Sequence, residues 1–76
     1  MAMRPRMEQT FTAVIKQDGD WWIGWIEELP GANAQENSRE DLIASLRVVL
    51  AEALSMNRQE ARLAAGSGYE ELALNV

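Results

Sequence analysis

The feature that most constrains the fold is an Asp-Gly pair between two runs of β-type residues, Thr10 to Lys16 (TFTAVIK) and Trp21 to Ile26 (WWIGWI). Asp-Gly in this position is among the strongest short-range signals for a β-hairpin, because a type I′ turn requires positive φ. We therefore expect two antiparallel strands joined by a two-residue Asp18-Gly19 turn, which places Gln17 opposite Asp20.

This register assigns each side chain to one face of the hairpin, since opposed residues share a face. The first face is apolar throughout and has small residues at its centre, where a helix can approach closely; it carries Phe11, Ala13, Ile15, Trp22, Gly24 and Ile26. The second face carries Thr12, Val14, Lys16, Trp21, Ile23 and Trp25. It is too apolar for an ordinary solvent-facing surface, so we expect it to be an interface. A change of one residue in the loop length would exchange the two faces.

The rest of the chain predicts one more strand, a long helix and a final strand. Leu29-Pro30-Gly31 ends the second strand, and Ala32 to Glu36 follows as a short third strand. Ser38 is a typical N-cap residue before two acidic residues, and apolar residues then recur at helical spacing. We expect a helix over residues 39–57 that continues to about residue 65. Gly66-Ser67-Gly68 ends it, and residues 69–76 alternate as a strand does.

The predicted order is therefore βββαβ, an α+β fold in which an antiparallel sheet is covered on one face by a long helix. We expect residues 9–76 to form a single domain and residues 1–8 to form a flexible N-terminal tail. A chain of 76 residues buries only roughly 60–65% of the surface that its unfolded form exposes. Its core is thin, and we expect it to form a homo-oligomer.

Charge and residue usage exclude several classes of function. Twelve acidic and seven basic side chains give a net charge of -5, which repels nucleic acids and anionic lipids. The absence of cysteine and histidine excludes disulfides and thiolate or imidazole chemistry, and fits a cytoplasmic protein. No segment approaches the ~20 apolar residues that a membrane span needs.

The remaining candidates for catalysis are carboxylates, and turn or cap positions explain most of them. Asp18 and Asp20 flank a turn glycine, and Glu40-Asp41 lie in the first turn of the predicted helix. The side chains of Glu27 and Glu28 diverge if both lie on a strand. We expect a non-enzymatic protein without a metal site or cofactor.

Two segments resemble the HicB-like antitoxin family of type II toxin–antitoxin systems. Residues 18–31 (DGDWWIGWIEELPG) match the family's DG turn, aromatic strand and LPG motif, and residues 37–42 (NSREDL) match its helix entry. The similarity covers about residues 10–56. The chain departs from the family pattern at Gly24, Glu27, Ala32 and Glu36; of these, Gly24 keeps a small residue beneath the helix.

The resemblance implies a partial ribonuclease-H-like fold without that enzyme's catalytic carboxylates. It also implies binding and neutralisation of a small basic HicA-type toxin, a ribonuclease that cleaves mRNA. Many members carry a further C-terminal domain that binds DNA. The predicted last strand reaches Val76, so we expect no direct DNA binding from this chain.

We expect the interface with the toxin, or between copies of the chain, at Val14, Trp21, Ile23 and Trp25, with Leu29-Pro30-Gly31 positioning the neighbouring loop. The sequence leaves open which of the two partners the tryptophans contact. The alternative function is a stand-alone homo-oligomeric module that binds a small ligand or regulates another process, with no toxin partner. A residual metal-dependent nuclease is a third possibility.

Overall fold

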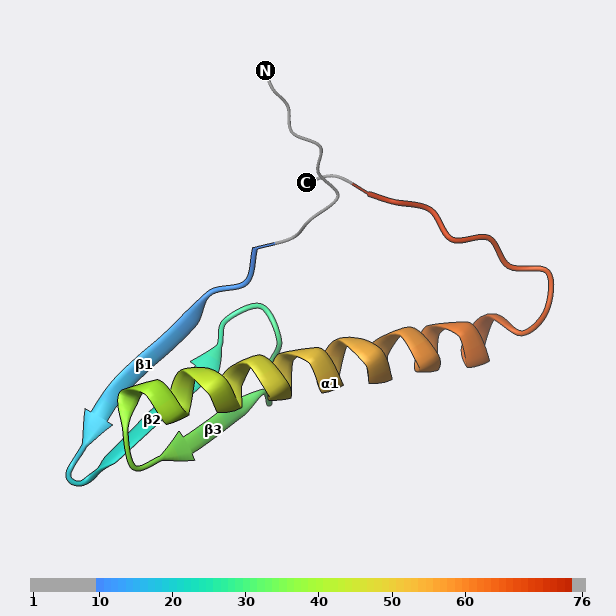
Figure 1. The fold of residues 1–76 in the computed structure, drawn as a ribbon. Helices are drawn as coiled ribbons and strands as arrows, with labels where there is room; N and C mark the ends of the chain where they lie inside the picture. Colours follow the sequence, from blue (N-terminus) through green and yellow to red (C-terminus); the bar gives the residue numbers. More distant parts are fainter. Residues whose placement is uncertain (1–9, 75–76) are drawn as a thin grey trace, which may run out of the picture.

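A computed structural model describes residues 10–74, in which three strands precede one long helix (Figure 1). The elements are β1 (Ala13–Asp18), β2 (Trp21–Ile26), β3 (Asn33–Glu36) and α1 (Arg39–Ala65). The strands lie in the order β1-β2-β3 and both neighbouring pairs are antiparallel. The described part of the chain is therefore α+β, as predicted. The predicted tail at residues 1–8 lies outside the described residues.

The hairpin register differs from the predicted one. Asp18 lies opposite Trp21, so the two central turn residues are Gly19 and Asp20. Gly19 has a φ of 63° and Asp20 does not have a positive φ. This is the pattern of a type II′ turn, in which only the first central residue needs positive φ. The predicted pairing of Gln17 with Asp20 was wrong by two positions, since Gln17 lies opposite Trp22. The reason is that Gly19 occupies the first central position of the turn, whose positive φ is unfavourable for a residue with a side chain.

The predicted assignment of residues to the two faces is nevertheless confirmed. Side chains alternate with a period of two along a strand, so a shift of two positions leaves every residue on its original face. Gly24 lies between Ile15 and Ala34 on the face that α1 covers. Trp25 lies between Val14 and Asn33 on the opposite face.

The helix begins and ends where local chemistry dictates. The Ser38 hydroxyl oxygen accepts a hydrogen bond of 3.1 Å from the backbone N–H of Asp41. Glu40 and Asp41 lie in the first turn, where the helix dipole favours negative charge. The helix ends before Gly66, whose φ of 76° suits a residue without Cβ. The predicted N-cap and the continuation to residue 65 are both confirmed.

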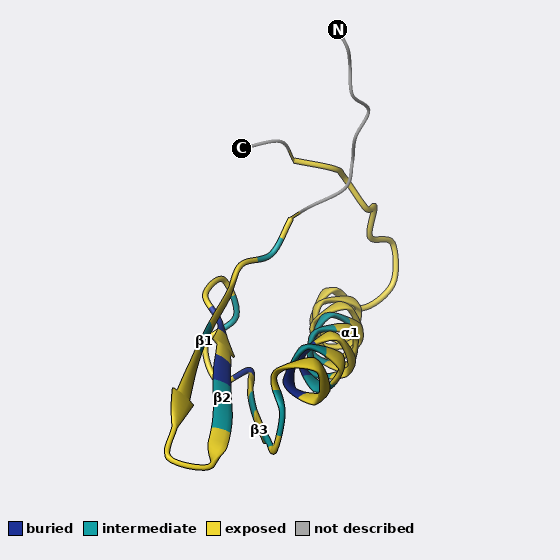
Figure 2. Ribbon diagram, turned by 60° about the vertical axis from the view of Figure 1, so that its left-hand side comes forward, coloured by how far each residue is buried: buried dark blue, intermediate teal, exposed yellow. Residues whose placement is uncertain are grey.

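The core lies between α1 and the strands β2 and β3 (Figure 2). Gly24 lies in this core, next to Leu42, Leu46 and Ile15. A Cβ atom on Gly24 would lie 2.9 Å from Cδ1 of Leu46 and 3.0 Å from Cγ2 of Ile15. The ends of the Leu46 and Ile15 side chains would have to move to admit such an atom, so the helix packs on the sheet at a distance that favours glycine. The buried apolar side chains of the core are Ile26, Ala32, Leu42 and Leu46, of which Leu42 is fully buried.

The predicted last strand is not formed in the described residues. Residues 69–74 belong to no strand, and Leu72 and Leu74 are 73% and 78% exposed; residues 75–76 lie outside the described range. The helix has 27 residues and is about 40 Å long at the usual rise. The six-residue strands span only about 20 Å. The chain therefore leaves the helix well beyond the end of its own sheet.

The close approach at Gly24 predicts the effect of enlarging this residue. Gly24→Val should lower the free energy of unfolding by about 1–3 kcal/mol, because the added methyl groups overpack the contact with Leu46 and Ile15. The midpoint of urea unfolding measures this change. Gln35→Val, on the exposed face of β3, is the control and should leave the midpoint almost unchanged. A Gly24→Val protein as stable as the original would contradict the packing described.

Candidate functional site

The outer face of the sheet is an exposed apolar surface centred on β2. Trp21 and Trp25 are 45% and 43% exposed, and Val14, directly opposite Trp25, is 44% exposed. Ile23 lies between the two tryptophans and is half-buried. Helix α1 lies on the opposite side of the sheet, and no other helix or strand of residues 10–74 lies over this face (Figure 2). We call Val14, Trp21, Ile23 and Trp25 the tryptophan face.

Polar side chains on the two outer strands border the tryptophan face. Lys16 and Gln35 flank Ile23, Asn33 lies opposite Trp25, and Asp18 lies opposite Trp21. All four are exposed. An apolar centre with a polar border is the usual composition of a protein–protein interface. Of these four side chains, Lys16 is positive and Asp18 is negative.

The structure brings Val14, Trp21, Ile23 and Trp25 together, and it places the other predicted site residues elsewhere. Leu29, Pro30 and Gly31 lie in the turn between β2 and β3. The backbone N–H of Leu29 donates to the carbonyl of Ile26 at 3.1 Å, and that of Ala32 donates to the carbonyl of Leu29 at 3.0 Å. Leu29 packs against the core on the helix side.

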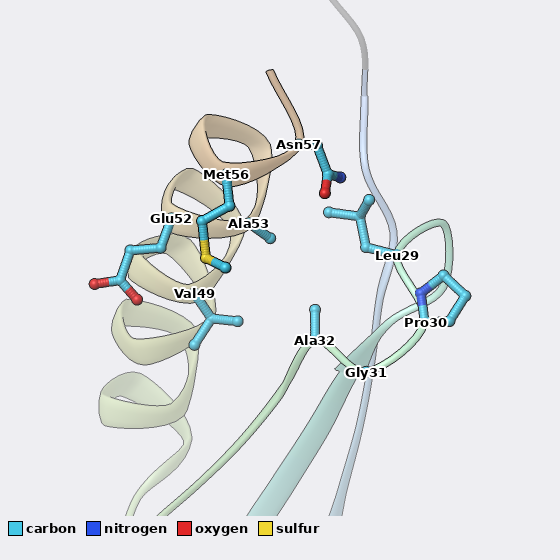
Figure 3. Close-up of a pocket in the computed structure, with 9 residues that line it drawn as sticks. All are labelled: Leu29, Pro30, Gly31, Ala32, Val49, Glu52, Ala53, Met56 and Asn57. Carbon is cyan, nitrogen blue, oxygen red and sulfur yellow. The ribbon is translucent and has the colours of Figure 1, made fainter. Parts of the chain in front are cut away.

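This turn and the middle of α1 enclose a groove of about 540 Å³ (Figure 3). The side chain of Leu29 points toward the helix, whereas the carboxylate of Glu52 points away from the groove. The residues that line the groove are Leu29, Pro30, Gly31, Ala32, Val49, Glu52, Ala53, Met56 and Asn57.

Sequence reasoning did not identify the helical side of this groove. The sequence did contain an indication of it. The last buried residue of the helix is Leu46, but the apolar stripe continues past it through Val49, Ala53 and Met56. The same pattern suits ordinary core packing, and only the position of the turn shows that these residues line an opening.

Glu28 accepts a hydrogen bond that links the turn between β2 and β3 to the segment before β1. The backbone N–H of Thr12 donates to Oε1 of Glu28 at 2.8 Å, and the N–H of Glu27 donates to the carbonyl of Thr12 at 2.9 Å. The hydrogen bond from Thr12 favours the charged carboxylate and lowers the pKa of Glu28 below its usual value. This role is structural, because the bond holds two segments of backbone together.

The carboxylates do not converge elsewhere in the described range. Residues 10–74 contain no group of three or more acidic side chains close enough to hold a metal ion. The same residues contain no helix with the length and apolar character needed to cross a membrane.

Comparison with known proteins finds no match: no family model fits this chain, and neither a curated protein nor a solved structure matches it.

The bond between Thr12 and Glu28 predicts a pH dependence. A carboxyl group whose pKa is lower in the folded than in the unfolded protein stabilises the fold above its unfolded pKa, and this contribution is lost as the pH falls through the folded pKa. The original protein should therefore have a higher free energy of unfolding than Glu28→Gln near neutral pH. This difference should shrink as the pH falls through the pKa that Glu28 has in the folded protein. Urea unfolding across acidic pH measures it, and a difference independent of pH would contradict the assignment.

Proposed function

We propose that this protein is a cytoplasmic, non-enzymatic antitoxin that binds a small basic ribonuclease of the HicA type and inhibits its cleavage of mRNA. The observation that carries the proposal is the tryptophan face, which the described chain leaves uncovered. Large exposed apolar patches with a polar border commonly mark protein-binding surfaces. Tryptophan is also the residue type most typical of interface hot spots.

Charge supports a basic protein as the partner. The net charge of -5 attracts a basic protein over a distance and speeds association, whereas contacts of buried aromatic side chains slow dissociation. A toxin that cleaves RNA needs a positive surface to hold the phosphate backbone. An acidic protein bound near that surface would compete with RNA and so inhibit cleavage.

The resemblance of residues 18–31 and 37–42 to the HicB-like antitoxins supports the choice of toxin class. The family's small residue beneath the helix corresponds to Gly24, which the packing of Leu46 requires to be small. Both observations support an antitoxin domain of this type.

Co-expression with the product of the adjacent reading frame tests this function. We expect the two proteins to elute together in size-exclusion chromatography. We also expect the partner alone to cleave RNA and the complex not to do so. A neighbouring protein without ribonuclease activity, or one that does not bind this chain, would contradict the antitoxin proposal.

Within such a complex, Trp25→Ala should weaken binding by roughly 30-fold or more, as expected for loss of an interface hot spot. Leu63→Ala is the control: this residue is 82% exposed on α1, away from the tryptophan face. Isothermal titration and the RNA-cleavage assay measure both effects. If Trp25→Ala changes neither the affinity nor the oligomeric state, the tryptophan face is not the interface.

The groove favours a second candidate function, the binding of a small apolar ligand without any toxin partner. Its volume of about 540 Å³ lies in the range of known ligand pockets. A ligand that binds only the folded protein raises its melting temperature. In a thermal-shift screen of small apolar compounds, any true ligand should lose its effect in Ala53→Trp, which fills the groove. A screen without a shift would leave no support for this candidate.

A further inference from the structure

The segment after α1 has the character of a strand without a partner. In residues 69–74, Leu72 and Leu74 alternate with Glu71 and Ala73, and both leucines are largely exposed. No backbone hydrogen bond between this segment and another described element is formed. A bond of 2.9 Å from Nε of Arg62 to Oε2 of Glu71 holds the start of the segment near the helix.

Strand β1 is an edge strand whose outer backbone groups could pair with such a segment. It forms one side of the three-stranded sheet, and within residues 10–74 nothing pairs with its outer edge. It has six residues and no proline, so its backbone can accept another strand. Helix α1 packs on β2 and β3, which leaves Ala13 exposed and Ile15 half-buried on the helix side of β1.

The length of α1 limits how much of the segment can pair with β1 of its own chain. The helix extends about 20 Å beyond the sheet, as the difference between its length and that of the strands shows. A return over this distance takes about six extended residues, which are Gly66 to Glu71. Residues 69–71, half of the strand-like segment, would then be used for the return, and only residues 72–74 of the described segment would lie beside β1, whereas β1 of a second copy could pair with the whole segment.

We propose that residues 69–74 of one copy pair with the open edge of β1 in a second copy, and that the exchange is reciprocal in a two-fold symmetric dimer. Addition of a strand to an exposed sheet edge is a common mode of recognition, and symmetric exchange makes the two interfaces identical. This inference does not rest on the proposed antitoxin function.

The exchange would complete the helix side of the sheet. A helix about 10 Å wide covers two strands spaced about 4.8 Å apart, and α1 covers β2 and β3. The donated Leu72 and Leu74 share one face, and they would lie beside Ile15 and Ala13. The donated Glu71 would lie on the opposite face, beside Lys16, the single lysine of the chain. This attraction offsets part of the repulsion between two acidic copies.

Light scattering coupled to size-exclusion chromatography tests the exchange on the full chain. We expect a dimer, and we expect the double variant Leu72→Asp, Leu74→Asp to be monomeric with an unchanged helical signal in circular dichroism. Ala73→Asp adds a negative charge to the same segment on the opposite face and should remain dimeric. A monomeric original protein, or a double variant that remains dimeric, would overturn the proposal.

Cross-linking of mixed isotopes gives a second readout that needs no variant. Unlabelled and ¹⁵N-labelled chains are refolded together, and a carbodiimide is used to join the amine of Lys16 to nearby carboxylates. Mass spectrometry should find peptides that join Lys16 of one isotope to Glu71 of the other. Cross-links confined to chains of the same isotope, or none between these residues, would refute the exchange.

Discussion

The structure depends on the close approach of α1 to the sheet at Gly24. The two leucines that fill the space above this glycine, Leu42 and Leu46, are the most deeply buried side chains in the described chain. A domain of this size can bury few residues, so one tight contact of this kind has a large share in its stability. The contact also fixes which face of the sheet the helix covers, and so determines which face stays open.

The distribution of the three tryptophans follows from this constraint. On a strand, Trp22 shares the helix side with Gly24 and Ile26, whereas Trp21 and Trp25 must point to the other side. The helix side is filled by one helix and has no room for all three. Trp21 and Trp25 thus form an apolar surface that no other element of the described chain covers. We interpret this surface as a binding surface.

Much of the fold could be predicted from local patterns. Side-chain alternation identified both faces of the hairpin, and Ser38 identified the helix start. The hairpin register could not be predicted, because Gly19 suits either position of a two-residue turn. The alternation of residues 69–74 is compatible with a strand, but pairing depends on where a long helix delivers the chain. The helical side of the groove was missed because Ala53 and Met56 also fit a core stripe. The role of the tryptophan face remains a prediction.

The indole signals of the three tryptophans offer the most direct test of the tryptophan face as a protein-binding surface. In a ¹H–¹⁵N spectrum, titration with the ribonuclease encoded by the adjacent reading frame should shift or broaden the side-chain signals of Trp21 and Trp25. The signal of Trp22, which lies on the helix side, should change little and serves as the internal control. A titration that perturbs Trp22 alone, or none of the three, would contradict the account.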